Sequence, residues 1–148
     1  MRDIKEIILH CSDSPFGDWS VIDEWHRARG WDSCGYHFVI LNGIAKYAHK
    51  YAPNIDGYVE NGRPIATVGA HCYGKNQTSI GICLIGRNHF TSAQLFESLP
   101  MLLRKLLKNH NLNVDDIYGH YSFRNEKTCT NFNVREYRKY IKARECWD

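Results

Sequence analysis

The sequence predicts a single α/β domain, in which helices flank a central mixed β-sheet. Two short apolar runs, at residues 4–10 and 79–85, are typical of buried strands. A leucine-rich stretch that begins near Thr91 instead repeats its apolar residues at helical spacing. Strands that alternate with helices along one chain favour an α/β architecture. The length of 148 residues fits one domain, residues 1–148, and no internal repeat or linker divides it.

The N-terminal half is expected to contain two strands, one helix and a hairpin arm. Residues 4–10 form the first strand, since isoleucines and a leucine follow one another there. A helix is predicted over 20–29, with Ser20 as its N-cap. Residues 36–41 form the second strand. Asp56-Gly57 is a turn signal, so a hairpin arm is predicted at that point.

The C-terminal half is expected to contain one central strand and two helices. The run at 79–85 is apolar enough to lie in the middle of the sheet. Residues 91–94, Thr-Ser-Ala-Gln, form a capping box that opens the longest helix. Pro100 should kink or split this helix, because proline lacks the backbone N–H donor. A second capping box at 133–136 begins the last helix.

Composition excludes several classes of protein. The apolar share is 43%, and no segment approaches the roughly 18 apolar residues of a membrane span, so no membrane insertion is expected. The first six residues lack the apolar stretch of a signal peptide, which predicts synthesis in the cytoplasm. The formal net charge of +3 is too small to indicate a nucleic-acid partner.

Six cysteines make a disulfide framework an alternative to be weighed. Against it, the chain is long enough to be held by its core, no pair has CxxC spacing, and no secretion signal is visible. Most of the cysteines are therefore expected to be small buried hydrophobic residues, and Cys83 inside an apolar run is the clearest example. The six lie at positions 11, 34, 72, 83, 129 and 146.

Two histidines and one cysteine form a candidate zinc site. His10 and His120 each close a short apolar run, and Cys129 follows in a polar loop. Two imidazoles and a thiolate occupy three corners of the tetrahedron that Zn²⁺ prefers, which leaves one corner for water. Structural zinc sites are closed by four protein ligands, so a site with three protein ligands indicates a catalytic zinc ion. One Zn²⁺ per chain is expected. Cys11, next to His10, is expected to point to the other face of the strand.

Several ordered motifs resemble the zinc-dependent N-acetylmuramoyl-L-alanine amidases of the phage lysozyme and peptidoglycan-recognition-protein type. The resemblance covers nearly the whole chain and keeps the family's order. It implies hydrolysis of the amide between the lactyl group of N-acetylmuramic acid and L-alanine, with peptidoglycan or its muropeptides as substrate. The motifs are Ile8–Ser12, Gly30-Trp31 with Gly35–Phe38, Asn61–Pro64, Val68–His71, Ser79–Leu84, and Gly119-His120 with Lys127–Cys129 and Phe132-Asn133.

The resemblance also implies roles for single residues. Tyr36 falls at the family's active-site tyrosine and Lys127 at its catalytic lysine, whose ammonium can stabilise the oxyanion. His71 is expected to contact substrate, with a fourth metal ligand as the alternative. His37 is a further substrate-binding candidate, although a core histidine or a residue that supports a ligand fits it as well. The resemblance implies that His10, His120 and Cys129 are the zinc ligands. It also implies that Arg63 and Asn76 lie near the substrate groove.

Two departures from the family pattern stand out. Thr130-Asn131 replaces the Pro-Gly that commonly follows the cysteine ligand, which leaves the shape of that loop open. Residues 43–55 look like an insertion, and surface decoration is favoured over extension of the groove.

Two alternative functions come from other classes. A peptidoglycan-binding module without activity is one, but such relatives typically lack the cysteine ligand. A cysteine peptidase with Cys129 as nucleophile and His120 as base is the other. The polar loop around Cys129 disfavours it, because helix N-termini are where thiolates are stabilised. The chain is expected to be a monomer without a separate cell-wall-binding domain. It is expected to act on the cell wall after release, or after export by a route that needs no signal peptide.

Overall fold

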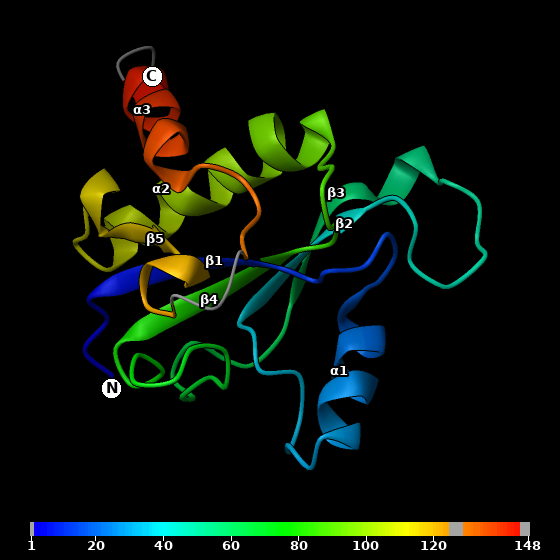
Figure 1. Cartoon of the computed structure of the whole chain (residues 1–148). Helices are drawn as coiled ribbons and strands as arrows, with labels where there is room; N and C mark the ends of the chain where they lie inside the picture. The colour runs from blue at the N-terminus through cyan, green and yellow to red at the C-terminus, as the bar shows by residue number, and fades with distance from the viewer. Residues whose placement is uncertain (1, 125–128, 146–148) are drawn as a thin grey trace.

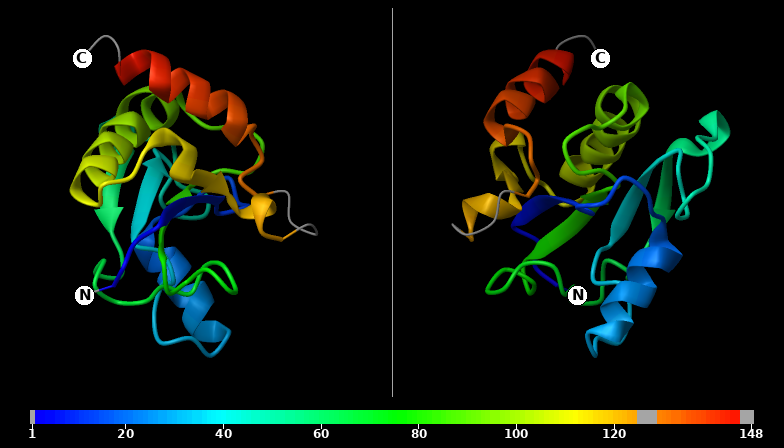
Figure 2. Two further views of the ribbon diagram at one scale, coloured as in Figure 1. Left: turned by 90° about the vertical axis from the view of Figure 1, so that its left-hand side faces the viewer. Right: turned by 45° about the vertical axis from the view of Figure 1, so that its right-hand side comes forward.

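A five-stranded sheet forms the middle layer of the molecule, with helices on both faces (Figures 1 and 2). The computed structural model describes residues 2–124 and 129–145. One face of the sheet carries α2 and α3, and the other carries α1 (Figure 1). The predicted α/β domain with a mixed sheet and flanking helices is confirmed.

The strands are arranged in the order β3-β2-β4-β1-β5. β4 lies between β1 and β2 and is parallel to both, while β5 is parallel to β1 and β3 is antiparallel to β2. All residues of β1 and β4 are buried, as is usual for strands covered on both faces. The bounds are Glu6–Cys11 for β1, Phe38–Asn42 for β2, Asp56–Asn61 for β3, Ser79–Leu84 for β4 and Ile117–Gly119 for β5.

The long helix predicted after Thr91 is split as expected at Pro100. Six residues of π-helix precede an α-helix, and the proline lies in the first turn of that α-helix, where no N–H is needed. The capping box is formed: the Gln94 side chain accepts from the Thr91 N–H at 2.9 Å, and the Thr91 hydroxyl from the Gln94 N–H at 3.1 Å. The helices are α1 at Trp19–Ala28, the π-helix at Ala93–Ser98, α2 at Leu99–Asn109 and α3 at Val134–Glu145.

The predicted N-cap of the first helix is wrong by two residues. Asp18 is the cap, because its carboxylate accepts from the Val21 N–H at 2.9 Å. The Ser20 hydroxyl instead donates to Asp18 at 2.7 Å. A carboxylate at the cap position outcompetes the hydroxyl two residues later, because it interacts more strongly with the positive end of the helix.

The hairpin arm predicted near Asp56-Gly57 is confirmed, because β3 pairs antiparallel with β2, but these two residues do not form its turn. Both residues lie inside β3, and the register shifts opposite them, so Gly57 with its φ of +81° occupies a bulge rather than a turn. The chain reverses instead through residues 43–55, which connect β2 to β3 and extend away from the sheet edge (Figure 1).

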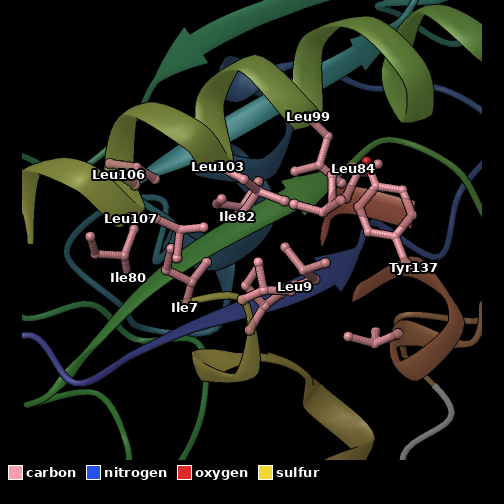
Figure 3. Close-up of a cluster of buried hydrophobic side chains, with 14 of the residues drawn as sticks. Ile7, Leu9, Ile80, Ile82, Leu84, Leu99, Leu103, Leu106, Leu107 and Tyr137 are labelled. Atoms are coloured by element: carbon pink, nitrogen blue, oxygen red, sulfur yellow. The ribbon is translucent and has the colours of Figure 1, made fainter. Parts of the chain in front are cut away.

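Two hydrophobic clusters hold the layers together. The larger one packs leucines of α2 and Tyr137 of α3 against Ile7, Leu9, Ile80, Ile82 and Leu84 of the sheet (Figure 3). The smaller one packs Ile22 of α1 against Val39 and Cys83 on the opposite face. Cys83 is fully buried, which confirms it as a filler residue. Across the described residues, none of the helices combines the length and apolar character that crossing a bilayer requires.

Candidate active site

The topology brings the two candidate histidine ligands together. His10 is the penultimate residue of β1, and His120 directly follows the adjacent parallel strand β5. Parallel neighbours end at the same edge of a sheet, so the two ring centroids lie only 4.6 Å apart. The ligand atoms of His10, His120 and Cys129 all lie within 4.8 Å of one another. Zinc bonds of about 2.0–2.3 Å place tetrahedral ligand atoms roughly 3.3–3.8 Å apart, so small side-chain movements accommodate the ion.

The segment 129–131 places the sulfur by folding over the end of β1. The Cys129 sulfur accepts a hydrogen bond from the backbone N–H of Cys11 at 2.9 Å. The buried Thr130 hydroxyl donates to the Leu9 carbonyl at 3.1 Å, and Asn131 donates to the Arg87 carbonyl at 2.9 Å. Asn131 has a φ of +69°, a conformation that asparagine tolerates better than most residues. The departure from Pro-Gly therefore leaves a well-bonded loop.

Cys11 lies at the site rather than away from it, so its predicted orientation is wrong. Its side chain lines the same pocket and accepts from the Asn131 side-chain amide at 3.4 Å. The neighbouring Cys129 thiol lowers the pKa of Cys11, whereas Cys11, together with burial, raises the pKa of Cys129. β1 ends at Cys11, and the segment 129–131 contacts both the backbone and the side chain of this residue. A raised pKa disfavours Cys129 as a free thiolate nucleophile in the metal-free protein.

One ring nitrogen of His10 is hydrogen-bonded to a ring nitrogen of His71. His10 Nε2 and His71 Nδ1 lie 2.8 Å apart, and both side chains are buried. Burial lowers the pKa of His10 well below 6.5 and that of His71 to about 3. Both rings are thus neutral at neutral pH, which is the form in which imidazole binds a metal.

Tyr36 lies beside the three candidate ligands. Its ring centroid is 5.0 Å from that of His10. Surrounding protein atoms raise the pKa of Tyr36 well above 10, so the phenol keeps its proton. His26 packs on Tyr36, with centroids 5.4 Å apart.

From the sequence, His26 is predicted to face solvent, and this prediction is wrong. Its ring is buried, and its Nδ1 accepts from the Gly35 N–H at 2.8 Å. Burial lowers the pKa of His26 to about 4. In sequence, a lone histidine near the end of an amphipathic helix carries no signal of this contact, because its partner comes from the following loop.

The three candidate ligands, Tyr36 and His26 all line one pocket of about 720 Å³. Sequence reasoning missed several of the residues that line it. In the sequence, Ile22, Trp25 and Arg29 recur near one face of the predicted helix, which suggests packing, but all three line the pocket. The walls also include Trp31, Tyr73, Asp13 and Arg124. The pocket therefore combines aromatic surface with guanidinium groups next to the candidate metal ligands.

The four predicted substrate-binding residues are placed differently from one another. His71 and Asn76 line the pocket, and the Asn76 side chain accepts from the backbone N–H groups of residues 71 and 72, both at 2.9 Å. Arg63 does not line it, and donates to the carbonyls of Cys34 at 3.0 Å and Val68 at 2.9 Å. His37 is buried behind the pocket, where it bonds the Gly81 N–H at 3.1 Å and the Thr67 carbonyl at 2.9 Å. Lys127 lies outside the described residues.

The sequence profile of the N-acetylmuramoyl-L-alanine amidases matches residues 1–132, which is most of the chain. The chain belongs to this family. The amidase is 34% identical over 144 residues to an endolysin of Enterobacteria phage T3, which covers 90% of this chain and 84% of the endolysin. Similarity of this kind identifies an enzyme with N-acetylmuramoyl-L-alanine amidase activity, of the phage lysozyme and peptidoglycan-recognition-protein type.

Solved structures agree with this assignment of the amidase. The N-acetylmuramoyl-L-alanine amidase LysC from Clostridium intestinale URNW has a TM-score of 0.77 at 28% identity, covering 95% of this chain and 87% of LysC. A complex of the peptidoglycan recognition proteins LCa and LCx with tracheal cytotoxin has a TM-score of 0.67 at 25% identity, covering 87% of this chain and 76% of that one. The fold is thus common to both groups.

Proposed function

We propose that this amidase is a zinc hydrolase that cuts the bond between N-acetylmuramic acid and L-alanine in peptidoglycan, with His10, His120 and Cys129 as metal ligands. The observation that carries the proposal is the convergence of two imidazoles and one cysteine sulfur within 4.8 Å at the wall of a large pocket. This donor set suits Zn²⁺, and three protein ligands would leave one coordination position for water.

A zinc ion held there would supply an acidified water molecule and a Lewis acid for the amide carbonyl. The residues around the ion have separate roles in the reaction. Tyr36 retains its proton, so it acts as a hydrogen-bond donor to the oxyanion that develops on the carbonyl. The backbone N–H of Cys11 stabilises negative charge on the Cys129 sulfur.

Lys127 is proposed as the second group that stabilises the oxyanion. Its position two residues before Cys129, together with the family resemblance, supports this role. An ammonium near the carbonyl oxygen complements the charge that forms during attack.

The pocket surface suits a lactyl-peptide with carboxylate groups. Trp25 and Trp31 offer apolar faces, and Arg29 and Arg124 offer guanidinium groups for carboxylates. The structural similarity to proteins bound to tracheal cytotoxin supports a muropeptide ligand. His71 and Asn76 shape the wall between these groups, whereas Arg63 and His37 support the loops behind it. We further propose that the amidase acts as a monomer on the cell wall, and that the 43–55 segment decorates the surface.

Digestion of purified peptidoglycan sacculi, followed by mass spectrometry, tests the proposed function. We expect stem peptides with new L-alanine amino termini, loss of product after treatment with a chelator, and recovery after addition of Zn²⁺. The variant Cys129→Ala should be inactive, and the matched variant His89→Ala, at an exposed histidine, should retain full activity. Cleavage of a different bond, or chelator-resistant release of the same peptides, would contradict the proposal.

A further inference from the structure

A chain of hydrogen bonds leads from the candidate metal site into the sheet. His10 Nε2 lies 2.8 Å from His71 Nδ1, and His71 Nε2 lies 3.2 Å from the Ser79 hydroxyl. That hydroxyl is 2.7 Å from the carbonyl oxygen of Lys75. The side chains of His10, His71 and Ser79 are all buried. No step proposed above uses this chain of bonds.

The last acceptor fixes the direction of every bond in the chain. A carbonyl oxygen only accepts, so the Ser79 hydroxyl must donate its single proton to Lys75. Towards His71 the hydroxyl therefore accepts, which places the proton of the neutral His71 ring on Nε2. His71 Nδ1 is then a bare acceptor, and the proton between the two rings belongs to His10 Nε2. A neutral His10 with a proton on Nε2 has its lone pair on Nδ1.

The His71 ring has little freedom to leave this arrangement. A Cβ atom at Gly81 would lie 2.6 Å from the ring, and one at Gly69 would lie 2.7 Å from it. The ring thus packs directly on the backbone of β4 and of the preceding loop. The His71 backbone is held as well, because its N–H donates to the Asn76 side-chain oxygen at 2.9 Å. The surrounding chain therefore fixes the acceptor that faces His10.

We propose that His71 is a positioning residue that holds His10 in its Nε2–H tautomer and so presents Nδ1 to the metal ion. The proposal rests on the zinc site proposed above, but its tautomer prediction is testable without metal. Partners of this kind fix the orientation and basicity of a ligand, and their loss typically weakens metal binding about 10- to 100-fold.

Two substitutions separate an acceptor role from simple packing. His71→Leu fills much of the space but removes the acceptor, whereas His71→Asn keeps a carbonyl oxygen near the position of Nδ1. Competition with a chromophoric chelator should show a zinc dissociation constant about 10- to 100-fold higher for His71→Leu, and a value close to wild type for His71→Asn. His89→Leu, at an exposed histidine, is the control and should leave the constant unchanged. Equal zinc affinity in wild type and His71→Leu would overturn the proposal.

A second measurement needs no substitution. ¹⁵N NMR of the imidazole nitrogens in the metal-free wild-type protein should show His10 and His71 each protonated only on Nε2. A proton on His10 Nδ1 would overturn the proposal, whatever the zinc affinities. If the wild-type protein bound no zinc, the proposed function would fail, while these spectra would still decide the role of His71.

Discussion

His10 combines four contacts that define the chemistry of the site. Its ring centroid lies 5.0, 4.9 and 4.6 Å from those of Tyr36, His71 and His120, respectively. The side chain of Cys129 completes the set.

Replacing Tyr36 with phenylalanine should abolish most turnover and leave metal binding intact. The variant keeps the ring that packs on His10 and His26 but loses the hydroxyl proposed to donate to the oxyanion. Loss of one such donor costs about 10²–10³ in kcat. Steady-state kinetics on muropeptides and metal analysis check this, and a fully active Tyr36→Phe enzyme would remove the tyrosine from the mechanism.

The sequence predicts single site residues only where a motif or a local rule identifies them. His10, His120 and Cys129 lie within family motifs, and the structure brings all three together. Cys11 and His26 escaped correct prediction for a physical reason. Their partners, Cys129 and Gly35, lie in loops whose path depends on the packing of the whole chain.

At the scale of elements, β1 and β5 matter most, because their parallel pairing brings His10 next to His120. The π-helix that precedes α2 is tied to the same sheet by one buried side chain. Gln94 donates from its amide nitrogen to the carbonyls of Ile40 at 3.0 Å and Ile85 at 2.9 Å. Ile40 lies in the middle of β2 and Ile85 directly follows β4, at the point where the pairing of these two strands ends.

Gln94→Leu should destabilise the protein by about 2–3 kcal/mol. The substitution leaves two buried carbonyls and the Thr91 N–H without the partner that the amide provides. Urea unfolding monitored by circular dichroism measures the change. The control is Gln77→Leu at an exposed position, which should change the free energy of unfolding by less than about 0.5 kcal/mol. Equal stability of the two variants would show that the bridge contributes little.

Elements were predictable to the extent that their signals are local. The capping box at Thr91 and the cap at Asn133 depend on side chains within three residues, and both form. The bulge at Gly57 was not predictable in this way, because pairing with β2 decides whether such a residue turns the chain or bends a strand. Competition between Asp18 and Ser20 for one cap likewise depends on geometry that spacing does not specify.

At the scale of the whole molecule, the three layers enclose several neutral histidines. Burial lowers the pKa of both His26 and His37 to about 4, against about 6.5 in an unfolded chain. Between pH 6.5 and 4 the unfolded chain therefore binds protons that the folded protein does not. Stability is greatest above pH 6.5 and falls as the pH drops through this window.

Acid should consequently weaken the protein well before its carboxylates titrate. We expect the free energy of unfolding to fall steadily from pH 7 to pH 5 in urea titrations, with each histidine contributing up to roughly 3 kcal/mol by pH 4. His26→Gln should reduce the slope, whereas His49→Gln, at an exposed position, should not. A free energy that stays constant over this range would show that these rings take up protons without unfolding.

The central claim, that the two histidines and the cysteine hold a catalytic zinc ion, is tested most directly by metal reconstitution. Chelator-treated protein is titrated with Zn²⁺ while bound metal and release of L-alanine peptides are measured together. We predict that turnover rises in proportion to bound zinc and levels off at one equivalent per chain. Full turnover by the chelator-treated protein, before any zinc is added, would contradict the account.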